Sequence, residues 1–143
     1  MFVLDTNVLS SMMAPTPAPE MVAFVSGQPE ELLFTASVCQ AEILSGIAVL
    51  PEGRRRAGLE TAARAMFLED FAGRVLPFDE EAAVAYADIY AARRRAGRPA
   101  ATADLMIAAI AFCRKASVVT RNSADFESCR VTVINPWSNS FNR

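Results

Sequence analysis

The sequence contains no histidine among its 143 residues, and this absence excludes several kinds of chemistry. Without an imidazole the chain forms neither a Ser-His-Asp triad nor a Cys-His pair, and the two-histidine route to RNA cleavage is closed. The cysteines Cys39, Cys113 and Cys129 are odd in number and widely spaced, so we expect neither a zinc site nor a disulfide framework. Any hydrolysis by this protein must therefore use carboxylates.

Long apolar runs are also absent, because no stretch of 18 apolar residues occurs and Asp5 interrupts the apolar N-terminus at once. We therefore expect no targeting segment, no membrane association and a cytoplasmic location. The 14 basic and 16 acidic side chains give a net charge of −2, which argues against a protein that coats DNA but allows a local basic rim. The length suits one globular domain with its own core.

Short apolar segments alternate with helical patterns along the chain. Strands are predicted at residues 2–5, 32–35, 75–78, 117–120 and 131–134. Helices are predicted at residues 6–13, 20–26, 37–50, 54–73, 80–95 and 100–113. This alternation is typical of an α/β three-layer sandwich with a mainly parallel five-stranded sheet. We assign the domain to residues 1–137 and a C-terminal tail to residues 138–143.

Capping signals define several of the predicted helix ends. Ser37 and Gln40 have the spacing of a capping box, and Asp79 precedes two glutamates as an N-cap residue. The three arginines at positions 93–95 end the helix that Asp79 begins, as the helix dipole favours. We interpret these arginines, and those at 54–56, as solvated helix ends, with contacts to RNA phosphates as the alternative.

Polar side chains follow several of the predicted strands. Asp5 ends the first strand, and Glu42 lies one turn into the helix after the second. Thr120 and Asn122 follow the fourth strand, and Asp104 lies near the start of an alanine-rich helix. Taken singly, each has a structural explanation as a cap, a solvated helix position, a partner of the helix dipole or a turn residue. Because functional sites of parallel sheets lie beyond the carboxyl ends of the strands, we expect these side chains to share one site.

The chemistry of such a site follows from its charges. Three carboxylates brought together repel one another, so the cluster is stable only with protonation or with a hard cation. Oxygen ligands favour Mg²⁺, with Mn²⁺ as a substitute. A metal ion with open water positions supplies a nucleophile and stabilises charge on a phosphate, so the residues predict phosphodiester hydrolysis.

Five motifs occur in a characteristic order: Asp5-Thr6-Asn7, Glu42, the run from Ala100 to Asp104, Thr120-Arg121-Asn122, and Ile134 to Trp137. This set resembles the PIN-domain endoribonucleases of the VapC toxin family, nearest to the FitB-like branch, and the match runs from Phe2 to about Trp137. The resemblance implies a strand order of 3-2-1-4-5 and an Mg²⁺-dependent toxin that cleaves RNA. It also implies a homodimer, a small antitoxin that inserts a side chain into the site, and contact with DNA only through that antitoxin.

The same family pattern implies a role for each site residue. Asp5 and Asp104 would bind Mg²⁺ directly, and Glu42 would complete the acidic triad or act on the attacking water. Thr120 would supply a hydroxyl nearby. Asn122 stands where relatives often carry an acid, which predicts one firmly bound ion rather than two, with Asp125 as the other candidate for this fourth position.

Two other classes compete with this interpretation. One is a phosphoryl-transfer protein with an aspartate nucleophile, but haloacid-dehalogenase-like phosphatases need a second Asp where Asn7 stands, and receiver domains need adjacent acids and a late Lys. The other is a non-catalytic PIN-like module that binds RNA or a partner. The alanine-rich helix and the aromatic residues Trp137 and Phe141 favour a homodimer and an antitoxin groove, because they supply more apolar surface than a small domain needs.

Overall fold

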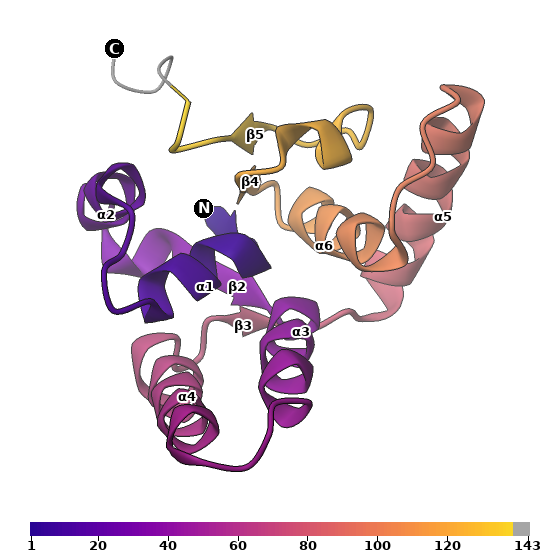
Figure 1. The fold of residues 1–143 in the computed structure, drawn as a ribbon. Helices are drawn as coiled ribbons and strands as arrows, with labels where there is room; N and C mark the ends of the chain where they lie inside the picture. Colours follow the sequence, from indigo (N-terminus) through magenta and orange to yellow (C-terminus); the bar gives the residue numbers. More distant parts are fainter. Residues whose placement is uncertain (139–143) are drawn as a thin grey trace.

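The computed structural model describes residues 1–138, which contain a five-stranded, all-parallel sheet (Figure 1). The strand order is β3-β2-β1-β4-β5. The strands are β1 (Phe2–Leu4), β2 (Leu33–Ala36), β3 (Val75–Leu76), β4 (Ser117–Val119) and β5 (Val133–Ile134). The predicted α/β class and the strand order are thus confirmed, although most strands are one or two residues shorter than predicted.

Six α-helices within residues 1–138 flank the sheet (Figure 1). In this view α1, α2 and α4 lie on one side of the strands and α5 and α6 on the other, and α3 packs against α1, α4 and α6. Their bounds are α1 (Thr6–Met13), α2 (Pro19–Ser26), α3 (Ser37–Ala48), α4 (Arg54–Ala65), α5 (Glu80–Arg95) and α6 (Thr102–Cys113). Three shorter turns are η1 (Glu30–Leu32), η2 (Met66–Asp70) and η3 (Ser123–Phe126). In this described part of the chain, no helix is long and apolar enough to cross a membrane.

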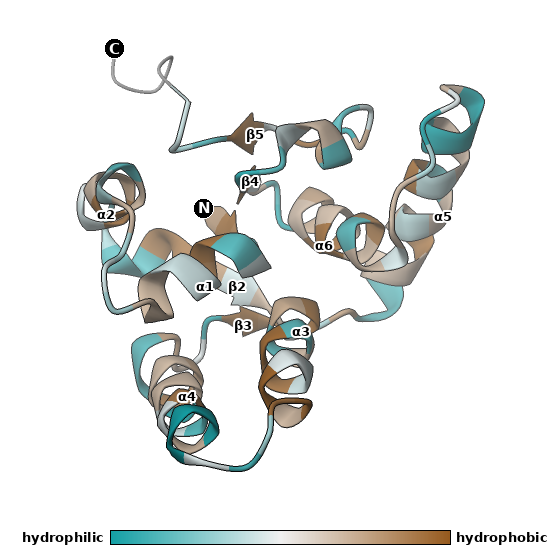
Figure 2. Cartoon of the chain, in the orientation of Figure 1, coloured by the Kyte–Doolittle hydropathy of each residue, from teal (hydrophilic) through white to brown (hydrophobic). Residues whose placement is uncertain are grey.

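The core is built on the central strand and on α6. Val3 and Leu4 of β1 have no exposed surface, because β1 pairs with β2 on one side and β4 on the other. The alanine-rich α6 packs against α5 and β4, and most of its apolar side chains are buried inside the domain. Figure 2 shows the hydrophobic strands and the polar outer ends of α4 and α5. The burial predicted for α6 is confirmed, but Phe112 is its one large apolar side chain with substantial exposure in the described residues, so α6 offers little surface to a second subunit.

Two predicted helix starts are wrong in detail. The backbone of Ala36 is the N-cap of α3, no side chain caps this end, and Ser37 is already the first helical residue. The capping box therefore does not form, since β2 runs directly into α3 and leaves no cap position for the Ser37 hydroxyl. The helix predicted to begin at residue 100 begins at Thr102, with Ala101 as its N-cap and no side-chain cap. By contrast, Asp79 caps α5 as predicted, accepting a 3.0 Å hydrogen bond from the backbone N–H of Ala82.

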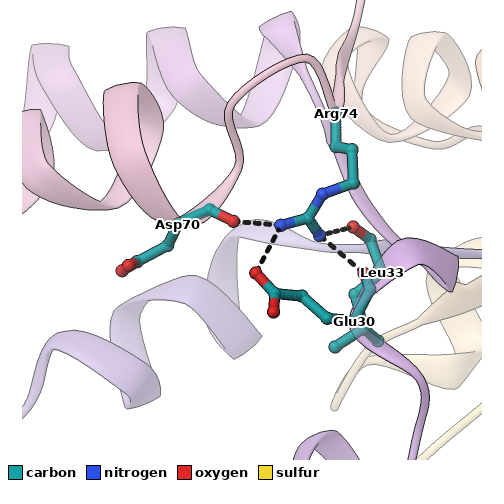
Figure 3. A network of polar contacts seen from close by, with 4 residues as sticks. All are labelled: Glu30, Leu33, Asp70 and Arg74. Atoms are coloured by element: carbon teal, nitrogen blue, oxygen red, sulfur yellow. Dashed lines mark hydrogen bonds and ion pairs between the residues drawn. The ribbon is translucent and has the colours of Figure 1, made fainter.

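The long helix predicted for residues 54–73 ends earlier. Regular α-helix stops at Ala65 and continues as the π-helical turn η2. Gly73 then takes a positive φ of 72°, a conformation that glycine adopts at little cost, and the chain turns into β3. Figure 3 shows how Arg74 secures this turn: its guanidinium donates to the carbonyl oxygens of Glu30, Leu33 and Asp70 and pairs with the Glu30 carboxylate.

The arginine cluster at the end of α5 is only partly solvated. Arg94 and Arg95 are exposed as predicted, but Arg93 is 5 % exposed. Its guanidinium donates to the carbonyl oxygens of Arg98, Ala124 and Glu127. The prediction of a solvated end is therefore wrong for Arg93, because the turn around η3 supplies the acceptors that allow this cation to be buried.

Candidate active site

A polar pocket of about 700 Å³ opens beyond the carboxyl end of β1. Asp5, Glu42, Asp104 and Asn122 line it, so four of the five predicted site residues meet there. They come from the end of β1, from α3, from α6 and from the turn after β4. The tertiary structure thus brings together the polar side chains that are widely separated along the chain, as the parallel-sheet argument predicts.

Asp5 has two structural roles at once. Its Oδ1 atom accepts a 2.7 Å hydrogen bond from the backbone N–H of Thr6 and so caps α1. Its Oδ2 atom accepts a 2.8 Å hydrogen bond from the Thr120 hydroxyl. Burial raises the pKa of Asp5, the hydrogen bonds from Thr120 and Thr6 oppose this, and the charges of Glu42 and Asp125 raise it further. The structure therefore shows Asp5 as the cap of α1, and the same carboxylate lines the pocket.

Thr120 lies beneath the pocket rather than at its surface. The residue is fully buried, and its hydroxyl oxygen accepts hydrogen bonds from Asn7 Nδ2 and from the backbone N–H of Asn122, each at 3.1 Å. Since its own proton goes to Asp5, Thr120 orients that carboxylate and ties it to the turn after β4. The structure thus places Thr120 beside Asp5, in contact with the carboxylate and not with the open pocket.

Asn7 is an additional site residue that the prediction does not include. Its Nδ2 atom donates to Asp5 Oδ2 at 3.3 Å and to Thr120, and its Oδ1 atom accepts a 3.0 Å hydrogen bond from the backbone N–H of Arg121. Asn7 therefore joins α1 to the turn after β4 at the wall of the pocket. Its position two residues after Asp5 is the sequence signal that could have identified it.

Glu42 and Asp104 complete the acidic surface. The Glu42 side chain is exposed, and its Oε1 atom accepts a 2.7 Å hydrogen bond from the Thr6 hydroxyl. Asp104 is half-buried, and burial together with the charges of Asp5, Asp125 and Glu42 raises its pKa to about 6, while Arg93 opposes the shift. Neutralisation by a cation or a proton would relieve this repulsion.

The donor set fits a hydrated magnesium or manganese ion. Within residues 1–138, no three acidic or thiol side chains stand close enough to enclose an ion by themselves. Mg²⁺ commonly keeps several waters and binds one or two protein carboxylates, so a complete protein cage is not required. Asp5 and Asp104 line one pocket, and their charges interact. These oxygen donors suit a hard cation, whereas zinc favours nitrogen and sulfur ligands.

The two candidates for the fourth position differ in location. Asn122 lines the pocket, and its backbone N–H is fixed by Thr120. Asp125 lies in η3, and among the described residues it is not part of the pocket lining. Its charge nevertheless contributes to the raised pKa of both Asp5 and Asp104, although burial is the larger cause in each case. Asn122 is thus the candidate that lines the pocket, and Asp125 acts through space on the carboxylates Asp5 and Asp104.

The fold and the site together define an α/β protein with an acidic pocket at the carboxyl edge of a parallel sheet. The PIN domain family model matches residues 2–130. Over 137 residues the chain is 37 % identical to the VapC ribonuclease Y4jK of Sinorhizobium fredii, covering 96 % of this chain and 98 % of that protein. It is 36 % identical over the same length to toxin FitB of Neisseria gonorrhoeae, covering 96 % and 99 %.

A solved structure is also similar to this chain in fold and sequence. The structure of FitAB bound to an IR36 DNA fragment contains a chain that is 36 % identical to this one, with a TM-score of 0.90 and 96 % coverage of both chains. The chain belongs to the PIN domain family, in the group of the VapC and FitB toxins. The resemblance inferred from the five motifs is confirmed, and the haloacid-dehalogenase-like and receiver-domain alternatives are wrong.

Proposed function

We propose that this protein is an endoribonuclease toxin of a toxin–antitoxin system, and that it hydrolyses RNA phosphodiester bonds with bound Mg²⁺ or Mn²⁺. Membership of the VapC and FitB group implies a nuclease toxin. The observation that carries the proposal is the convergence of Asp5, Glu42 and Asp104 on one pocket. Since the chain has no histidine, these carboxylates are the side chains at this pocket with the chemistry for hydrolysis.

Each side chain has a definite task in this reaction. Asp5 and Asp104 would hold the ion, which when bound lowers the pKa of a coordinated water and stabilises charge on the phosphate. Thr120 and Asn7 keep Asp5 pointing into the pocket through their hydrogen bonds to its Oδ2 atom. Glu42, exposed at the pocket rim, completes the acidic set or accepts a proton from the attacking water. Because Asn122 adds no charge, one ion rather than two is expected to dominate.

A neighbouring cleft suits the antitoxin. It has a volume of about 840 Å³, and apolar side chains of α1, α3 and α4 line it, among them Met13, Ile43 and Leu59. Glu42 borders both this cleft and the acidic pocket. An antitoxin segment that fills the cleft with apolar side chains would therefore place a residue next to the carboxylates. We assign any DNA contact to the antitoxin, and we place the complex in the cytoplasm.

We further propose that the protein forms a homodimer. Leu44 and Leu68 are exposed and line a further cavity beside α3, which favours a homodimer through this side of the molecule. Light scattering should give the mass of two chains.

We place the domain end at Trp137, because β5 and Trp137 pack against the core. Phe141 lies outside the described residues.

The test is cleavage of an unstructured RNA by the purified protein. We expect cleavage with Mg²⁺ or Mn²⁺, none in EDTA, and a large loss of activity in Asp5→Asn and Asp104→Asn. Asp88→Asn changes an exposed acid on α5 and serves as the matched control. Undiminished cleavage in EDTA, or equal losses in all three variants, would refute the metal mechanism. RNA binding without cleavage under every condition would instead favour the non-catalytic module.

A further inference from the structure

The acidic pocket also carries a cation and an aromatic ring on its wall. Among the described residues that line it, Arg121 is the one cationic side chain and Trp137 the one aromatic side chain. The Arg121 guanidinium lies over the Trp137 ring, with its carbon 5.6 Å from the ring centroid. The same pocket wall therefore holds a positive charge and a flat apolar surface close to three carboxylates.

The backbone around both residues is held in place. Asn135 Nδ2 donates a 3.2 Å hydrogen bond to the carbonyl oxygen of Arg121, and Asn135 Oδ1 accepts a 2.9 Å hydrogen bond from the backbone N–H of Trp137. The backbone N–H of Arg121 donates to Asn7, which also contacts Asp5. One short network thus sets the position of Arg121 and Trp137 relative to the carboxylate at the centre of the pocket.

The charge of Arg121 is available to a ligand. Within residues 1–138 its guanidinium forms no ion pair, and the residue is exposed. A pocket lined by Asp5, Glu42 and Asp104 repels a polyanion, so a substrate phosphate needs a nearby cation. A guanidinium binds phosphate oxygens through two parallel hydrogen bonds, which makes Arg121 suited to this contact.

The ring of Trp137 suits the base of the same nucleotide. Trp137 is half-buried against the core, so its body is fixed while part of its surface remains open to the pocket. Unpaired bases stack on aromatic side chains whatever their identity, and paired bases are not free to do so. The pocket volume of about 700 Å³ is within the range of small-ligand sites and has room for one nucleotide.

We propose that Arg121 and Trp137 form a nucleotide subsite beside the carboxylates, in which Arg121 binds a phosphate of a single-stranded RNA and Trp137 stacks on the adjoining base. The inference rests on the proposed RNA substrate but not on cleavage. It predicts that the protein selects unpaired over paired RNA. The subsite is polar, unlike the apolar cleft between α1, α3 and α4, and this difference favours a nucleotide over an antitoxin side chain as its ligand.

Binding is measured on the full chain in EDTA, so that hydrolysis does not contribute. Trp137 is the single tryptophan, and its fluorescence reports directly on stacking. An unstructured RNA of about eight nucleotides should quench this fluorescence, and a hairpin of the same composition should quench it less. Anisotropy of labelled RNA then compares the variants that lack the fluorophore.

The variants separate stacking from charge. Trp137→Leu should weaken binding about tenfold or more, and Trp137→Phe should restore most of it. Arg121→Gln should weaken binding similarly and lower the slope of log affinity against log salt by about 0.7, as expected for one lost contact to a single strand. Arg114→Gln removes an exposed charge at the far end of α6 and should change the slope little.

Three results would overturn the subsite. The first is wild-type affinity in both Trp137→Leu and Arg121→Gln. The second is weaker binding that accompanies a lower melting temperature and is not rescued by Trp137→Phe. That outcome would show that the two side chains only stabilise the fold. The third is unchanged RNA affinity with weaker binding of the co-purified antitoxin. If the RNA binds as predicted but is not cut with Mg²⁺, the subsite stands and the proposed cleavage fails.

Discussion

Asp104→Asn should make the metal-free protein more stable while destroying its activity. Burial and the neighbouring acids raise the pKa of Asp104 from 3.8 to about 6, so the folded state disfavours its charged form. The unfolded chain loses this proton near pH 3.8 and the folded chain near pH 6. The contribution of Asp104 to stability is therefore highest below pH 3.8 and is lost as the pH rises through the folded-state pKa of about 6.

The size of the stabilisation by Asp104→Asn follows from the shift in the pKa of Asp104. The full pKa shift corresponds to a destabilisation of about 3 kcal/mol by the charged Asp104. Because the half-buried carboxyl is screened by solvent, this destabilisation is reduced to about 1–2 kcal/mol. The favourable interaction of Asp104 with the N-terminal end of α6 offsets roughly 0.3–1 kcal/mol of this. Asp104→Asn should thus gain about 1 kcal/mol at pH 7.5, or roughly 3 °C in melting temperature.

The assay is thermal and urea unfolding in EDTA at pH 7.5 and pH 4, with Asp88→Asn as the control. The gain should be present at pH 7.5 and shrink at pH 4, where the Asp104 carboxyl of the wild type is already largely protonated in the folded state. Saturating Mn²⁺ should stabilise the wild type by about 2.7 kcal/mol at a hundred times its dissociation constant and stabilise Asp104→Asn less. A variant that is less stable than the wild type in EDTA at pH 7.5 would show that Asp104 is chiefly a helix-dipole residue and would refute this reasoning.

Three further changes test other contacts of the site and its support. Thr120→Val keeps the side-chain volume but removes the hydrogen bond to Asp5, so cleavage should fall sharply and urea unfolding should show a loss of about 1–3 kcal/mol. Asn122→Asp should strengthen Mn²⁺ binding in calorimetric titrations and preserve cleavage, while Asp125→Ala should leave the affinity nearly unchanged; the opposite ranking would identify Asp125 as the fourth ligand. Arg93→Met leaves the carbonyl oxygens around η3 without their donor and should cost about 3 kcal/mol in urea unfolding, whereas a loss below about 0.5 kcal/mol would contradict the buried role of Arg93.

Local sequence was sufficient for the order of elements and for the edge of the sheet at which the polar side chains gather. The apolar runs at Phe2–Leu4 and Ser117–Val119 and the N-cap at Asp79 depend on residues within one or two turns of one another, so periodicity and capping preferences predict them. The parallel sheet then follows from the alternation of strands and helices. Since the carboxyl ends of such strands share one edge, Asp5, Glu42 and Asp104 were predictable as neighbours.

The tertiary structure alone decided which partner each polar atom received. Arg93 is buried because carbonyl oxygens at Ala124 and Glu127, more than thirty residues away, come within reach of its guanidinium. In the same way, Asn7 meets Thr120 across a separation of 113 residues, and Arg121 meets Trp137 only where the ends of β4 and β5 approach each other. A hydrogen bond or a ring contact requires atoms within a few ångströms at a defined angle, and no local propensity specifies such a distance between residues far apart in the chain.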